Sequence, residues 1–151
     1  MKKNKFILCI NASRAKSGGA ITHILGILKD LKPEKYLIKE IHIWAYKDLL
    51  DKLKKKHWLK LHNHHFLEKS LLFQLFWERF IFPLNLRQIK NCILLNLDAG
   101  SICRYNPSFT MSRDMLSYEK GIVENYPLGF EKLRLMILKT IQNYSLKNSY
   151  G

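Results

Sequence analysis

The sequence is poor in the residues that break or restrain a backbone. It has four Pro and seven Gly among 151 residues, and it shows no low-complexity tract and no internal repeat. Hydrophobic residues make up 47% of the chain, which excludes collagen-like and disordered classes and allows a buried core. We therefore expect residues 1–151 to form one domain.

Cysteine is also scarce, with Cys9, Cys92 and Cys103 as its only occurrences. Three cysteines make an odd count, and their spacing matches no zinc site. Cys9 and Cys92 lie in apolar runs, so we expect buried thiols in a reducing compartment.

The sequence lacks a long apolar run that is free of charge. Phe6–Ile10 is too short for a secretory signal. The stretch from Phe66 to Leu86 is longer but contains Glu68, Lys69, Glu78, Arg79 and Pro83. A membrane span needs about 20 residues with few charges, so we expect this stretch to form a helix that packs against the rest of the protein. We accordingly expect a cytoplasmic protein.

Acidic residues are the minority, with 12 Asp and Glu against 26 Lys and Arg and a formal net charge of +14. This surplus favours an anionic partner. Specific nucleic-acid binding is not expected, because no helix-turn-helix, zinc-finger or RNA-recognition signature is present. The basic stretch Lys52–Trp58 could meet phosphates or a membrane, with Trp58 as an interfacial anchor, although we favour the solvated face of a short helix.

Hydrophobic periodicity predicts strands that alternate with helices. The expected strands cover residues 5–11, 36–44, 57–61, 91–96 and 108–112. The expected helices run from Ala20 to before Pro33 and over 47–56, 68–86 and 129–144. In the last helix we expect a buried side formed by Phe130, Leu133, Leu135, Met136, Leu138 and Ile141. The order predicts an α/β fold, a Rossmann-like, mostly parallel sheet with helices on both faces.

A short glycine segment, Ser17-Gly18-Gly19, follows the first predicted strand and precedes a helix. Glycine allows close backbone approach, and a helix amino terminus attracts anions, which suits a phosphate or a sugar hydroxyl. The alternative is a plain tight turn. We favour binding because ligands of parallel sheets lie beyond the carboxyl ends of strands.

Polar residues follow the later strands: Asn96, Asp98, Ser101, Arg113, Asp114 and Glu119. Carboxylates there can act as a base or bind hydroxyls, and Arg113 can pair with phosphate, although loop solvation and helix capping explain these residues equally well. His62, His64 and His65 lack further ligands at matching spacing, so we expect a polar loop and no metal site. No Ser-His-Asp or Cys-His nucleophile arrangement is evident.

Three segments carry a family resemblance. They are Ile7–Ser13 leading into Ser17–Ala20, Leu75–Phe80 followed by Ile93–Asn96 and Gly100-Ser101, and Met111–Glu119. Together they resemble the amino-terminal domain of GT-B glycosyltransferases of the family-4-like group. The third segment looks like the family pattern M-x-x-N-M-x-P-F-E, with Asp114 in place of Asn and Ser117 in place of Pro.

The resemblance implies transfer of a sugar from a nucleotide-sugar donor, as co-substrate, to a glycan or lipid-linked acceptor. No other cofactor is expected. We assign catalysis to Asp114 and Glu119. We assign substrate binding to Ser17, Gly18, Gly19, Asn96, Gly100, Ser101 and Arg113, on one wall of an interdomain cleft.

In this family a second Rossmann-like domain holds the donor, and the present sequence ends after the helix that would lead to it. We therefore expect this chain to be the acceptor-side half of the enzyme and to be inactive alone. Either the chain is a truncated product, or a separate polypeptide completes the cleft. Family habits suggest surface-polysaccharide assembly at the inner membrane face. The alternative is a non-catalytic basic module that binds anionic membrane or a partner protein.

Overall fold

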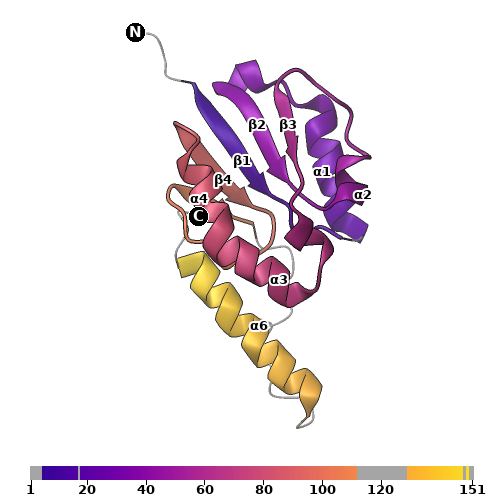
Figure 1. The fold of residues 1–151 in the computed structure, drawn as a ribbon, viewed down its shortest axis with the longest axis vertical. Coiled ribbons are helices and arrows are strands. Elements are labelled where there is room, and N and C mark those ends of the chain that lie inside the picture. Colours follow the sequence, from indigo (N-terminus) through magenta and orange to yellow (C-terminus); the bar gives the residue numbers. More distant parts are fainter. Residues whose placement is uncertain (1–4, 17, 112–128, 148, 150–151) are drawn as a thin grey trace.

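The computed structural model describes residues 5–16, 18–111, 129–147 and 149. Its centre is a five-stranded sheet in which all neighbouring strands run parallel (Figure 1). The strands are β1 (Phe6–Asn11), β2 (Ile38–Trp44), β3 (Leu59–His62), β4 (Cys92–Asn96) and β5 (Ser108–Thr110), in the order β3-β2-β1-β4-β5. The predicted α/β fold with a parallel sheet is confirmed.

β1 lies at the middle of the sheet and pairs with β2 on one side and β4 on the other. Its last residue, Asn11, stands beside Trp44 of β2 and Asn96 of β4. The chain winds outward from β1 in both directions, so the strand order reverses between β1 and β4. In open α/β sheets such a reversal opens a crevice at the carboxyl edge, where ligands bind.

One face of the sheet is covered by α1 (Gly18–Asp30), by α2 (Lys47–Leu50) and by the segment that leads into β3 (Figure 1). A 3₁₀ turn, η1 (Pro33–Tyr36), connects α1 to β2. Apolar side chains at helical spacing in α1, such as Ile24 and Leu28, pack on alternate strand residues such as Ile41 and Ile43. This periodicity explains why the sequence alone predicted α1.

The other face is covered by three consecutive helical segments, α3 (Leu71–Phe76), the π-helical turn η3 (Trp77–Ile81) and α4 (Phe82–Arg87). A short 3₁₀ turn, η2 (His65–Glu68), precedes them. Trp77, Phe82 and Leu86 are fully buried in this layer and pack with Cys9 and Leu94 of the sheet. The predicted burial of Cys9 and Cys92 is confirmed, and their sulfur atoms lie 2.7 Å apart.

Two details of the sequence prediction are wrong. The basic helix expected over residues 47–56 ends at Leu50, and Trp58 is only 7% exposed, so it cannot be an interfacial anchor. In the closing helix α6 (Phe130–Lys147), Leu133 and Met136 are more than half exposed, because no described element packs over them. Periodicity shows that a helix has an apolar side but not that another element covers it.

No helix within the described residues is long and apolar enough to cross a membrane.

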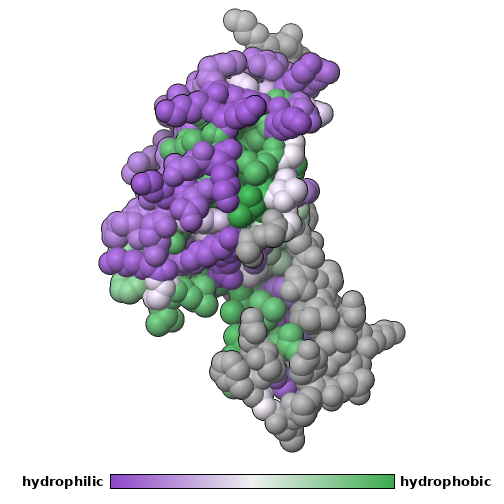
Figure 2. Space-filling model, turned by 90° about the vertical axis from the view of Figure 1, so that its right-hand side faces the viewer, coloured by the Kyte–Doolittle hydropathy of each residue, from purple (hydrophilic) through white to green (hydrophobic). Residues whose placement is uncertain are grey.

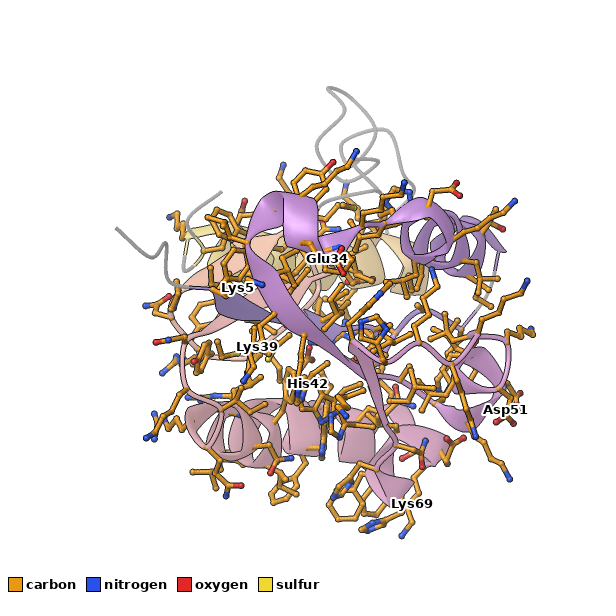
Figure 3. All side chains as sticks on the ribbon, turned by 90° about the horizontal axis from the view of Figure 1, so that it is seen from above. Lys5, Glu34, Lys39, His42, Asp51 and Lys69 are labelled. Carbon is orange, nitrogen blue, oxygen red and sulfur yellow. The ribbon has the colours of Figure 1, made fainter. Side chains whose placement is uncertain are left out.

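Two histidines meet on β2 and β3 at the edge of the sheet. Nε2 of His62 lies 3.0 Å from Nδ1 of His42, and the His62 ring stacks on Trp44 with centroids 4.5 Å apart. His42 lies on the side of the sheet that faces α3 and α4 (Figure 3). Burial, and secondarily the neighbouring His42, lower the pKa of His62 to about 4.

This lowered pKa predicts acid sensitivity. In an unfolded chain His62 takes up a proton near pH 6.5, whereas in the folded chain it stays neutral until about pH 4. The contribution of His62 to stability is therefore complete above about pH 6.5 and is lost as the pH falls towards 4. We expect the melting temperature of His62→Gln to decline less than that of the wild type between pH 7 and pH 5. The exposed His23→Gln serves as the control, and equal declines in all three proteins would contradict the prediction.

Candidate functional site

A buried polar network occupies the carboxyl edge of the sheet where the strand order reverses. Asn11 is its hub. Nδ2 of Asn11 donates to Oε1 of Glu78 at 2.6 Å and to Oδ1 of Asn96 at 3.1 Å. Its Oδ1 accepts from the hydroxyl and the backbone N–H of Ser13 at 2.8 and 3.3 Å. The amide of Asn11 thus has a partner for both donors and for its acceptor, although it is 4% exposed.

Glu78 adds a carboxylate to this network from the helical layer formed by α3, η3 and α4. It lies in the π-helical turn η3 and is 2% exposed. Its Oε1 also accepts from the Ser101 hydroxyl at 2.7 Å, and its Oε2 lies 3.3 Å from the Arg14 guanidinium. Burying a carboxylate is costly unless it is paired and hydrogen-bonded, and here both oxygens have partners. Helix η3 is thereby fastened to the ends of β1 and β4.

The network continues along the loops that follow β4. Asn96 donates to the Thr110 hydroxyl at 3.3 Å, and the Ser101 hydroxyl accepts from the backbone N–H of Cys103 at 3.3 Å. Burial raises the pKa of the Cys103 thiol, and the Glu78 carboxylate raises it further. The raised pKa favours a neutral thiol at Cys103 and disfavours the thiolate that a nucleophile needs.

Two charged side chains form the outer layer of the site. The Arg14 guanidinium lies between Glu78 and the Asp98 carboxylate, which is 4.0 Å away. Asp98 is the accessible member, with 43% of its side chain exposed, and its Oδ1 accepts from the Gly100 N–H at 2.6 Å. A Cβ atom at Gly100 would lie 2.5 Å from the Arg14 guanidinium and 2.7 Å from Oδ1 of Asp98, so a larger residue there would displace these two side chains.

These loops meet at a narrow surface crevice whose interior has no room for a water molecule. It is lined by the end of β1, by Ser13 and Arg14, and by Glu78 and Asp98. A ligand would therefore meet the exposed rim of this crevice, where Asp98 accepts hydrogen bonds and the Arg14 cation is partly neutralised by its carboxylate partners.

The predicted glycine loop lies at the start of α1. Gly18 and Gly19 are the first two residues of the helix, so they belong to its first turn. No atom lies within 4 Å of the position that a Cβ of Gly19 would occupy, so the space above this residue is open. Free backbone N–H groups of the first helical turn attract anions.

The structure brings Asn96, Gly100 and Ser101 together, as predicted. The prediction that they contact the substrate directly does not fit the burial of Asn96 and Ser101. Asn96 and Ser101 are 3% and 2% exposed, and their polar atoms bond to protein groups. They hold the loops in place. Four of the predicted site residues, Ser17, Arg113, Asp114 and Glu119, lie outside the described residues.

Sequence reasoning did not assign roles to Asn11 and Glu78. Glu78 was a usable signal, because it is the only carboxylate in the segment from Leu75 to Phe82, where all other residues except Arg79 are apolar, and a buried Glu needs partners. His62 stacks on Trp44 of the sheet, whereas His64 stacks on His65. Within the described part of the chain, no three His, Cys, Asp or Glu side chains converge as a metal site would require.

Comparisons of the chain with protein-family models, curated protein sequences and solved structures found no match. The glycosyltransferase resemblance therefore stays a prediction that rests on the sequence motifs.

The network predicts a large effect of a small change. In Glu78→Gln an amide replaces the carboxylate. Its oxygen can still accept from Asn11 and Ser101, but its NH2 group then faces the Arg14 guanidinium in place of Oε2, so the ion pair is lost and two donors meet without an acceptor. An unsatisfied buried group costs about 1–3 kcal/mol, which we expect as the loss of unfolding free energy in urea followed by tryptophan fluorescence. The exposed Glu34→Gln should change stability by less than about 0.5 kcal/mol. Equal stability of the two variants would contradict this assignment.

Proposed function

We propose that this chain is the acceptor-side domain of a glycosyltransferase that moves a sugar from a nucleotide-sugar donor to an acceptor hydroxyl. The carboxyl edge of the sheet would form one wall of the reaction cleft. The observation that carries the proposal is the polar network of Asn11, Asn96, Ser101 and Glu78 at the strand-order reversal. The resemblance of the sequence motifs also places the substrate at this edge.

The chemistry of the outer layer supports binding of sugar hydroxyls. The exposed carboxylate of Asp98 can accept a hydrogen bond from a sugar hydroxyl. Its position is fixed by Arg14 and by the Gly100 N–H, so little side-chain entropy is lost on binding. The first turn of α1, with the open space above Gly19, would meet the phosphates of a donor or a lipid-phosphate acceptor.

The family resemblance implies that a second domain holds the donor nucleotide. We therefore propose that sugar transfer requires such a domain in addition to the residues described, on the same or on a separate polypeptide. Asp114 and Glu119 remain the proposed catalytic carboxylates, with Arg113 and Ser17 as proposed phosphate or substrate ligands. Surface-polysaccharide assembly at the inner membrane face is the proposed setting.

Two alanine variants of the same helix test this site. Gly19→Ala and Gly26→Ala both add a methyl group where no atom lies within 4 Å, so both should fold and gain about 0.5–1 kcal/mol of stability. Only Gly19 adjoins the proposed cleft. We expect a prenyl-diphosphate-linked sugar, as a lipid-linked acceptor, to bind Gly26→Ala like the wild type and Gly19→Ala at least tenfold more weakly.

Backbone amide shifts in NMR provide the readout for this comparison. Ligand-dependent shifts should concentrate at residues 12–16, at Gly19 and at 97–101. Equal binding to both alanine variants, or shifts confined to other parts of the chain, would overturn the proposed site.

A second candidate function, binding to an anionic membrane, is favoured by an exposed apolar stripe on the α3–α4 layer. Leu72, Phe76, Phe80 and Leu84 recur every four residues and are 76%, 51%, 56% and 56% exposed. Lys69 and Arg79 lie over neighbouring Phe73 and Phe80 rings. Apolar side chains flanked by cations suit a headgroup interface of negative charge.

Vesicle co-sedimentation separates this candidate from the first. If the stripe binds membrane, Phe76→Ser/Phe80→Ser should lose association with phosphatidylglycerol vesicles at 50 mM salt, with or without a nucleotide sugar. Phe109→Ser removes a phenylalanine of β5 that is 45% exposed and lies outside the stripe, and it should bind like the wild type. Binding that the stripe variant retains would reject the membrane function.

A further inference from the structure

A second concave site lies at the opposite end of the sheet from the polar network. It has a volume of about 330 Å³ and opens between the carboxyl-terminal half of α1 and residues 52–59, which lead into β3. Ligand pockets commonly span about 300–1,000 Å³, so this one has the size for a small molecule. Figure 2 views this side of the molecule and shows hydrophobic surface between hydrophilic side chains in its upper half.

The floor of this pocket is apolar. Four leucines line it: Leu25, Leu28, Leu53 and Leu59. Leu28, Leu53 and Leu59 are at most 7% exposed and belong to the hydrophobic core. The pocket is therefore a depression in the core wall, and an alkyl chain placed in it would leave water for contact with carbon.

The rim of the pocket is entirely cationic. Lys29, Lys52, Lys54 and Lys56 complete the lining, and no acidic side chain takes part in it. The Lys56 side chain already binds other parts of the fold, because its Nζ donates to the carbonyl oxygens of Leu28 and Lys29 at 2.7 and 2.9 Å. It also lies 4.9 Å from the centre of the Trp58 ring.

The other three lysines are available to a ligand. Lys29, Lys52 and Lys54 are exposed and make no ion pair or side-chain hydrogen bond with any described residue. Three positive charges around an apolar depression are repulsive to one another, and an anion seated among them would relieve that repulsion. Inorganic phosphate would satisfy the charges but would leave the leucine floor in water.

We propose that this pocket binds a single-chain amphiphilic anion, with an alkyl chain on the leucine floor and a carboxylate or phosphate head among Lys29, Lys52 and Lys54. The site is separate from the carboxyl edge of the sheet, so it stands or falls independently of the glycosyltransferase function.

Titration of the full chain with decanoate and with decyl phosphate below their micelle concentrations tests this proposal by calorimetry and NMR. We expect saturable binding with shifts of the methyl groups of Leu25, Leu28, Leu53 and Leu59. Lys52→Ala/Lys54→Ala should weaken binding about tenfold or more, since each cation near an anionic head contributes about 1 kcal/mol. Lys35→Ala/Lys39→Ala removes the same charge from exposed positions outside the pocket and should leave binding unchanged.

Leu25→Trp tests the floor without altering charge. Leu25 is only partly buried on α1, so a larger side chain there fills the pocket and leaves the core in place. It should abolish decanoate binding. If the protein binds uncharged decanol as tightly as decanoate, the proposed role of the lysines is wrong. If both double lysine variants weaken binding equally, the net charge of the protein and not the pocket explains the effect. Binding to anionic vesicles but not to monomeric decanoate would replace the pocket with a membrane surface.

Discussion

The hydrogen bond between Asn11 and the buried Glu78 joins the central strand to the helical layer and to the loops of the candidate site. Asn11 ends the central strand and Glu78 projects from the helical layer, 67 positions further along the chain. Because a buried carboxylate must keep all its partners, the loops after β1 and β4 and the turn η3 are held in one arrangement. A π-helical turn supplies this residue, and such turns occur frequently at functional sites.

This constraint gives the carboxyl edge two levels. The inner level is buried, and its polar groups form hydrogen bonds with one another, so it positions the loops. The outer level comprises Asp98, Arg14 and the start of α1, and it is the level to which the proposed function assigns contact with a ligand. A site built this way is preorganised, which suits recognition of a polar sugar, whose hydroxyls must exchange water for protein partners without a large entropic cost.

The basic surplus of the chain is distributed between regions of different character. Around the leucine-floored pocket, lysines stand without carboxylate partners among the described residues, whereas Arg14 is held between two carboxylates. Along α3 and α4, cations accompany exposed aromatic rings. The same net charge of +14 therefore includes lysines around an apolar pocket and cations beside an exposed apolar stripe, and the net charge alone could not distinguish these two arrangements.

The sequence by itself determined the class of fold, because buried parallel strands read as apolar runs and surface helices as periodic ones. It placed β1, β4 and α1 within a few residues, and it directed attention to Asn96, Gly100 and Ser101. Only the tertiary structure decided that Asn96 and Ser101 face inward, that Leu133 and Met136 remain exposed, and that Glu78 meets Asn11. Periodicity is local, whereas partners of a buried polar group come from distant segments that only folding brings together.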